Sequence, residues 1–265
     1  MDLILLLKAF ILGIVEGATE FLPISSTGHL IIVGDLLNFS DGKGDIFEIV
    51  IQLGAILAVC FEFRKRLLNT ISHLFNEPSA QGFAINLIIA FMPAALLGLA
   101  FHDYIKAYLF SPISVAIALI VGGFAILLIE KYTSHSATHA IESITKKQAL
   151  QIGLAQSLAL VPGVSRAGAT ILGGMVFGLT RQTATEFSFF LAIPIMFAAT
   201  GYDLLNSWHL LGLTDLPLFV IGFVTAFFSA DLVIKVLIKY VASHDFTGFA
   251  WYRIIFGTIV LVYFW

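Results

Sequence analysis

The sequence predicts an all-α polytopic membrane protein with six transmembrane helices, two re-entrant helical hairpins and an inverted-topology repeat. Three observations support this fold class. The chain of 265 residues is 59% hydrophobic and 12% charged, against roughly 45–50% apolar and about 25% charged residues in soluble domains. Its apolar runs are unbroken and of helix length, whereas a transmembrane barrel alternates over strands of about ten residues. Finally, two polar segments interrupt this otherwise apolar sequence.

Six apolar segments approach the length of about 20 residues that a helix needs to cross a bilayer. In chain order they are about Ile46–Phe63, Phe83–Phe101, Ile113–Ile129, Thr183–Tyr202, Leu216–Ile238 and Phe249–Trp265. With the two polar segments they predict a single integral-membrane domain over residues 1–265.

The two polar segments lie outside these six runs. EGATEFLPISSTGH covers Glu16–His29, and PGVSRAGAT covers Pro162–Thr170. The apolar arms that flank each segment are too short to cross a bilayer. Irregular backbone is tolerated at membrane depth only where protein or a wet cavity encloses it. We therefore expect two re-entrant hairpins, with an ordinary transmembrane helix over Leu3–Phe21 as the alternative for the first arm.

Residues of the first hairpin recur 140 positions later. The matches are Gly13 with Gly153, Ser25 with Ser165, Gly28 with Gly168 and Gly34 with Gly174, while Gln156 stands where Glu16 predicts an acid. Each half, about 1–131 and 141–265, then holds one hairpin and three spans. Because three is odd, the second half enters from the opposite face, which predicts an inverted repeat whose hairpins meet near the midplane. Chance matching of abundant glycines and serines is the alternative.

Lysines and arginines divide unevenly between the two faces of this topology. One face receives Arg64, Lys65, Arg66, Lys131, Lys146, Lys147, Arg181, Lys235 and Lys239, and the other receives Lys8, Lys43 and Lys106. Cytoplasmic loops carry an excess of basic residues. The first face is therefore predicted to be cytoplasmic, so that both termini and the mouth of the first hairpin face outward.

Two acids in the first hairpin are the strongest candidates for a catalytic or metal site. Glu16 and Glu20 are four residues apart, so on a helix they share a face. Carboxylates within membrane-buried sequence usually have a function. The pair could bind a divalent cation, Mg²⁺ or Ca²⁺, through oxygen ligands, or one of them could act as a general base. A pair at a hydrated helix end is the structural alternative.

Hydroxyl and guanidinium groups complete the two polar segments. They belong to Ser25, Ser26, Thr27, Ser165, Arg166 and Thr170. A proline precedes the serines in each segment, which predicts a chain break followed by a capped helix. Two helix N-termini pointing into the membrane centre form an anion site, to which Arg166 adds a bidentate fork. At least one of Ser25 and Ser26 is expected to act only as a cap.

His29 lies three residues after Ser26 and four after Ser25, so it returns to the face of these hydroxyls. It could activate a nucleophile, protonate a leaving oxygen or attack phosphorus itself, and a purely structural histidine is the alternative. Other polar residues within the spans are weaker signals. Glu48 and Gln52 could line the same cavity, Glu186 could cap a helix, and Asp231 and Lys235 could simply pair.

At these residues the chain resembles the bacterial undecaprenyl-pyrophosphate phosphatases associated with bacitracin resistance. EGATEFLPISSTGH and PGVSRAGAT are similar to the two motifs of that family, and FEIVIQLGAILAV and EFSFFLAIP match it as well. The resemblance covers essentially the whole chain. It implies a plasma-membrane phosphatase that depends on a divalent cation, has its active site open to the outer face and recycles the lipid carrier of peptidoglycan synthesis. The active-site positions carried over are Glu16, Glu20, Ser26, Thr27, His29, Ser165 and Arg166.

Two other classes of protein stay open from the residues alone. A secondary transporter or flippase for a phosphorylated anion or lipid would use the same inverted repeat and helix-end anion site. A non-catalytic scaffold would need neither the acid pair nor the buried arginine. The net charge of -3 gives no reason to expect a nucleic-acid partner. The expected partners are membrane lipids and the lipid substrate, and a homodimer stays an open alternative.

Overall fold

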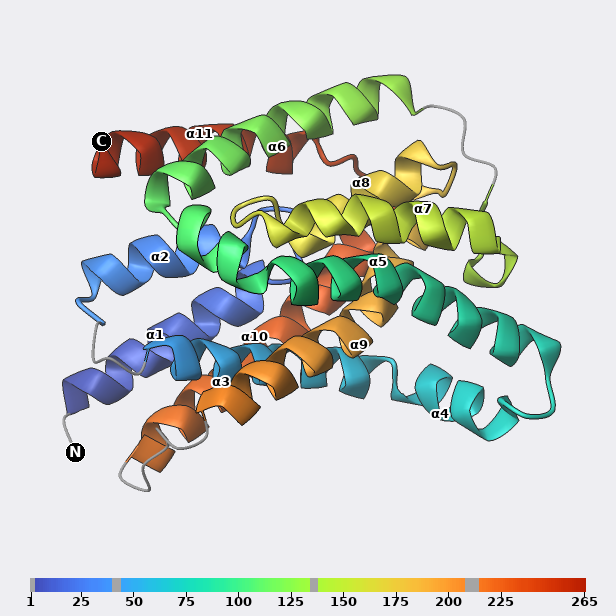
Figure 1. Ribbon diagram of the computed structural model, residues 1–265, viewed down its shortest axis with the longest axis horizontal. Helices are drawn as coiled ribbons and strands as arrows, with labels where there is room; N and C mark the ends of the chain where they lie inside the picture. The colour runs from blue at the N-terminus through green and yellow to red at the C-terminus, as the bar shows by residue number, and fades with distance from the viewer. Residues whose placement is uncertain (1–2, 40–43, 134–137, 208–214) are drawn as a thin grey trace.

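The computed structural model describes residues 3–39, 44–133, 138–207 and 215–265, and these residues form α-helices joined by short turns (Figure 1). The helices are α1 (Leu3–Thr19), α2 (Ser26–Leu36), α3 (Gly44–Glu62), α4 (Arg64–His73), α5 (Pro78–Tyr108), α6 (Pro112–Tyr132), α7 (Lys146–Gln156), α8 (Arg166–Val176), α9 (Arg181–Ser207), α10 (Leu216–Val241) and α11 (Thr247–Phe264). Two short 3-10 helices, Ile141–Ser143 and Ser157–Leu160, flank α7. Lys43, one of the basic residues used above, lies outside the described residues.

Five of the six predicted spans are confirmed as helices long and apolar enough to cross a membrane. These are Pro78–Phe101, Pro112–Tyr132, Arg181–Leu205, Leu216–Val241 and Thr247–Phe264. The remaining prediction, Ile46–Phe63, is confirmed only in part. Its residues Ile46–Glu62 qualify as a span only together with α4, and α4 is bent away from α3 by 72°.

Starts of the long helices follow ordinary sequence signals. Proline lies in the first turn of α5, α6 and α10, where its missing N–H would have had no helical partner. Ser111 caps α6 by accepting a hydrogen bond from the Ser114 N–H. Thr145 and Gln148 form a capping box at the start of α7. These local choices agree with the packed fold.

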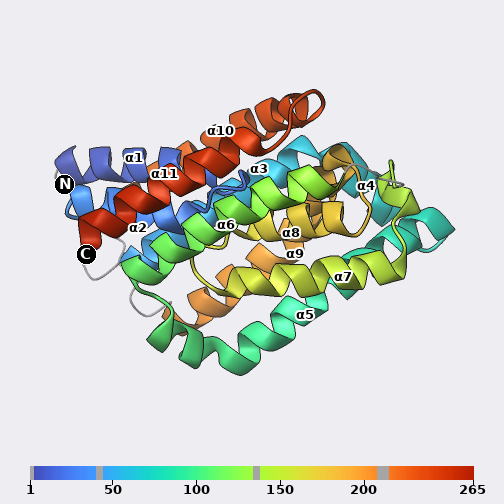
Figure 2. The same cartoon turned by 90° about the horizontal axis from the view of Figure 1, so that it is seen from above.

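Both chain termini lie at the same end of the molecule, and α4 lies at the other end (Figure 1). Helices α6 and α11 run side by side in both views (Figures 1 and 2). Helix α10 packs against both α1 and α3. The approach of α1 to α10 depends on glycine, because a Cβ at Gly13 would overlap the main chain of Gly222.

Four helices are too short to cross a bilayer. Helix α1 has 17 residues, and α2, α7 and α8 have 11 each, against the ~20 that a span requires. They form two consecutive pairs, and α1 contacts α2 as α7 contacts α8. The predicted polar segments lie at the turns between the members of each pair.

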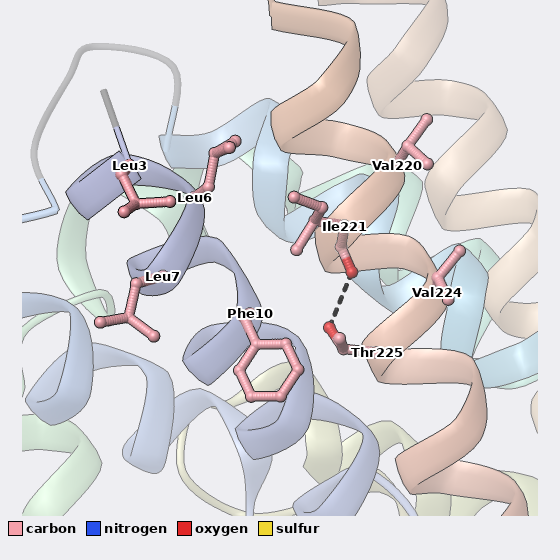
Figure 3. Close-up of a pocket in the computed structure, with 8 residues that line it drawn as sticks. All are labelled: Leu3, Leu6, Leu7, Phe10, Val220, Ile221, Val224 and Thr225. Atoms are coloured by element: carbon pink, nitrogen blue, oxygen red, sulfur yellow. Dashed lines mark hydrogen bonds between the residues drawn. The ribbon is translucent and has the colours of Figure 1, made fainter. Parts of the chain in front are cut away.

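An apolar groove of about 590 Å³ lies between the first half of α1 and α10 (Figure 3). It is lined by Leu3 to Phe10 on one side and by Val220 to Thr225 on the other. The Thr225 hydroxyl donates a hydrogen bond to the Ile221 carbonyl at 2.8 Å, so the polar atom at its edge is already paired within α10. None of the candidate site residues lines this groove, so the polar chemistry lies elsewhere.

Candidate active site

The first polar turn joins α1 to α2 and carries most of the candidate residues. Ser25 ends it with φ 69°, a left-handed conformation that is uncommon for a residue with a Cβ. This conformation reverses the chain so that α2 begins at Ser26. The Ser25 side chain makes no capping hydrogen bond, and its backbone carbonyl accepts a hydrogen bond from His29 instead.

The second polar turn joins α7 to α8 and repeats this backbone. Ser165 has φ 74°, and α8 begins at Arg166 as α2 begins at Ser26. Here the cap is made, because the Ser165 hydroxyl accepts from the Gly168 N–H at 3.0 Å. The same hydroxyl donates to the Leu22 carbonyl at 3.3 Å. Ser165 thus links the second turn directly to the first.

Glu20 brings the chemistry of the two turns together. One of its carboxylate oxygens accepts from the Ser26 hydroxyl at 2.5 Å. The other accepts from Arg166 at 3.0 Å. Both side chains of this ion pair are largely buried. A hydroxyl, a carboxylate and a guanidinium from two distant segments therefore meet in one cluster, as the sequence predicted.

Arg166 is held in place by α9 as well as by Glu20. Its other terminal nitrogen donates to the Ser188 carbonyl at 3.2 Å, and its Cζ lies 5.5 Å from the centre of the Phe21 ring. Its Nε is buried and has no hydrogen-bond partner among the described residues. One donor of the fork therefore stays available for an anion.

Glu16 differs from Glu20 although the two acids are four residues apart. It is fully buried, at 0% exposure, and neither of its carboxylate oxygens has a hydrogen-bond partner within the described structure. The charges that act on it are those of Glu20, Glu48 and Arg166. An unpartnered buried carboxylate is costly, so Glu16 needs a ligand, a proton or water to be stable. Hard oxygen donors of this kind suit Mg²⁺ or Ca²⁺.

His29 has both ring nitrogens occupied. Its Nδ1 donates to the Ser25 carbonyl at 2.7 Å, since a carbonyl can only accept. Its Nε2 lies 2.6 Å from the hydroxyl of Tyr252, and its ring stacks on Phe256 at a centroid distance of 4.2 Å. In the neutral imidazole, Nε2 accepts the proton of Tyr252. The expected approach of His29 to the Ser26 hydroxyl is replaced by a contact with α11.

The remaining candidates have mainly local partners. The Thr170 hydroxyl lies 2.5 Å from the Ser188 hydroxyl and 2.9 Å from the Arg166 carbonyl, so it ties α8 to α9. Thr27 lies in the first turn of α2. Among the weaker signals, Glu186 pairs with Arg66 at 3.1 Å and contributes to an ion pair outside the cluster. The predicted pairing of Asp231 with Lys235 is confirmed at 2.7 Å.

Two residues close to the cluster were not singled out from the sequence. Tyr252 contacts His29, and the Ser188 carbonyl contacts Arg166. Tyr252 is one of several tyrosines near the ends of spans, and a backbone carbonyl leaves no trace in a sequence. Within the described ranges, no three His, Cys, Asp or Glu side chains are grouped closely enough to hold a metal ion together. Glu16 and Glu20 are the two acids that the first turn offers.

Comparison with known proteins identifies the family. The family described as Bacitracin resistance protein BacA matches residues 9–259. Curated relatives match over nearly their whole length. A protein of Methylobacillus flagellatus is 63% identical over 270 residues, covering 100% of both chains. Proteins of Laribacter hongkongensis and Nitrosospira multiformis are 57% and 58% identical, covering 97% and 96% of those chains. Each of the three relatives is named undecaprenyl-diphosphatase.

Proposed function

The chain belongs to the bacitracin resistance protein BacA family, and we propose that it is an undecaprenyl-diphosphatase of the bacterial plasma membrane. It hydrolyses undecaprenyl diphosphate to undecaprenyl phosphate and inorganic phosphate, which returns the lipid carrier to peptidoglycan synthesis. The observation that carries the proposal is the Ser26–Glu20–Arg166 cluster. It occurs in a chain that matches the named relatives from end to end.

Ser26 is the nucleophile in this proposal. Its hydroxyl oxygen attacks the terminal phosphorus, the bridging P–O bond breaks, and undecaprenyl phosphate leaves with the bonding electrons. Glu20 takes the hydroxyl proton, because its carboxylate is the group 2.5 Å from that oxygen. Water then attacks the phosphoserine, and Glu20 returns the proton to Ser26 as inorganic phosphate departs. We therefore assign to Glu20 the proton transfer that sequence spacing suggested for His29.

Arg166 and the starts of α2 and α8 bind the diphosphate. A planar guanidinium matches phosphate oxygens bidentately, and helix N-termini present free N–H groups to an anion. Arg166 pairs with Glu20 when no substrate is bound. Substrate oxygens then compete for the guanidinium, which leaves Glu20 free to act as a base. Such preorganised charge is the main contribution that a protein makes to phosphoryl transfer.

Glu16 and Glu20 would hold Mg²⁺ or Ca²⁺. This assignment is supported by the two carboxylate oxygens of Glu16, which are buried without a partner. When bound, such a cation neutralises negative charge on the phosphoryl oxygens.

An inverted repeat with its site open to the outer face would explain the architecture. Several observations support it. Helices α2 and α8 have equal length and start 140 residues apart, after serines with nearly equal φ. A left-handed residue also follows each helix, at Asn38 and at Gly178. In a Cys60→Ala background, an impermeant thiol reagent should label Leu36→Cys from outside and Asn76→Cys only in opened membranes. Labelling of both from outside would refute this topology.

The decisive experiment for the activity is phosphate release from undecaprenyl diphosphate by the purified protein in detergent. Wild type should release inorganic phosphate, added chelator should lower the rate, and Ser26→Ala should abolish it. No gradient exists in detergent, so a transporter would release nothing. Absence of hydrolysis across Mg²⁺, Ca²⁺ and several prenyl lengths would refute the phosphatase and favour the transporter.

A further inference from the structure

Arg253 of α11 is a buried cation with an unusual set of partners. It is 1% exposed, and all five N–H groups of its guanidinium donate hydrogen bonds to main-chain carbonyls. The acceptors are Leu119 (from Nε, 3.2 Å), Pro23 and Val164 (from Nη1, 3.0 and 2.9 Å), and Ala118 and Gly163 (from Nη2, 3.0 and 2.9 Å). No carboxylate is among these partners. A buried arginine usually faces an anion, so its role needs another explanation.

These five carbonyls belong to three separate segments. Pro23 lies in the first polar turn, three residues before Ser26. Gly163 and Val164 lie in the second polar turn, directly before Ser165 and Arg166. The remaining two carbonyls belong to α6. One side chain therefore fastens both polar turns to each other and to a long helix.

We propose that Arg253 is a positioning residue for diphosphate hydrolysis, holding the two turns at the separation at which Ser26 and Arg166 act on the same substrate. This inference rests on the proposed function. Only a planar fork with five donors can bind five carbonyls from three segments, whereas a lysine has three donors at one point. Reacting groups must be placed closely, and a shift of about 1 Å can lower a rate on the order of 100-fold.

Gly122 on α6 gives an independent way to disturb this arrangement. A Cβ at Gly122 would overlap the guanidinium of Arg253, whereas a Cβ at Gly82 on α5 would meet nothing within 4 Å. Gly122→Ala therefore displaces the guanidinium while every acid, hydroxyl and arginine of the site stays in the chain. Gly82→Ala is the matched control, since it makes the same substitution within a helix.

The kinetic test compares Arg253→Lys and Gly122→Ala with two controls, Gly82→Ala and Arg181→Lys. Arg181 is also a bridging arginine, bound to Glu130 of α6, but it contacts neither polar turn. We expect kcat to fall on the order of 100-fold in Arg253→Lys and Gly122→Ala, with KM changed much less. The two controls should keep wild-type kcat. Wild-type kcat in either test variant, or an equal loss in the controls, would overturn the proposal.

A second measurement does not depend on activity. Hydrogen exchange followed by mass spectrometry should show about tenfold faster exchange in peptides covering residues 20–27 and 160–168 of both test variants, but not of the controls. Acceleration in only one of the two turns, or in neither, would overturn the positioning role. If the wild type releases no phosphate, the proposed function fails, and the exchange of the two turns still decides whether Arg253 holds them together.

Discussion

The turns before α2 and α8 share a backbone and differ in chemistry. Ser25 and Ser165 have φ of 69° and 74°, and each precedes a helix of 11 residues. Yet the first turn supplies the acids and the hydroxyl, and the second supplies the cation. Arg166 stands where the repeat places Ser26, and Gln156 stands where it places Glu16. A duplicated frame thus presents complementary groups to one point, which a single helix end cannot do.

The sharpest break in this complementarity is loss of the hydroxyl at the first turn. Ser26→Ala should reduce kcat to background, because a covalent nucleophile has no substitute in the cluster. His29→Ala should cost less, on the order of 10²-fold, because His29 contacts Ser25 and Tyr252 rather than the Ser26 hydroxyl. Phosphate release under single-turnover conditions measures both. A larger loss in His29→Ala than in Ser26→Ala would reverse the two roles.

The equivalent change at the second turn is Arg166→Lys. We expect kcat/KM to fall on the order of 10²–10³-fold although the charge is kept, because an ammonium cannot contact Glu20 and the Ser188 carbonyl with the same geometry. Steady-state kinetics on prenyl diphosphate would measure this loss. Near-normal turnover in a folded Arg166→Lys protein would remove Arg166 from the phosphate site.

Glu16 and Gln156 allow the two hairpins to be compared at equivalent buried positions. Their exposures are 0% and 2%, and the polar atoms of both side chains lack a hydrogen-bond partner in the described structure. Glu16→Gln should lower kcat by about 10²-fold and abolish the response to Mg²⁺ or Ca²⁺. Gln156→Met, its matched control, should keep the metal response.

The two acids should also act as one unit. Glu16→Gln combined with Glu20→Gln should therefore lose much less than the product of the single losses. Activity that is indifferent to added cation in wild type and in every variant would contradict the metal assignment.

The smallest expected difference concerns the caps. Ser165→Ala removes a hydroxyl that accepts from the Gly168 N–H and donates to the Leu22 carbonyl, so it should lower the free energy of unfolding by about 1 kcal/mol. Ser25→Ala removes no capping bond and should cost less. Denaturant titration in mixed micelles would compare the two. A larger loss in Ser25→Ala would contradict the asymmetry between the turns.

Much of this arrangement follows from local sequence. Length and apolarity predict the long helices, and five of the six predicted spans are confirmed. Proline followed by serine predicted where α2 and α8 begin. The cluster of Glu20, Ser26 and Arg166 was expected as a group because ionisable residues in apolar sequence need partners.

Other features depend on contacts between residues far apart in the chain. Spacing brought His29 toward the serine hydroxyls, but Tyr252, 223 residues later, binds its free nitrogen. Arg253 was recognisable as a charge inside a span, yet its partners are carbonyls, which carry no sequence signal. The bend after α3 was missed because the apolar pattern continues to Phe63 while the helix axis turns after Glu62.

That bend of 72° separates an apolar helix from one with a different surface. Helix α4 carries Arg64 and Lys65 at its start, and Leu68 and Ile71 are exposed along its length. A helix with basic and apolar groups of this kind lies flat among lipid headgroups, with its apolar side chains dipping toward the acyl chains. Helix α4 would then act as a float on the cytoplasmic leaflet. Because it is joined rigidly to α3, it would set how deeply the two polar turns lie below the opposite surface.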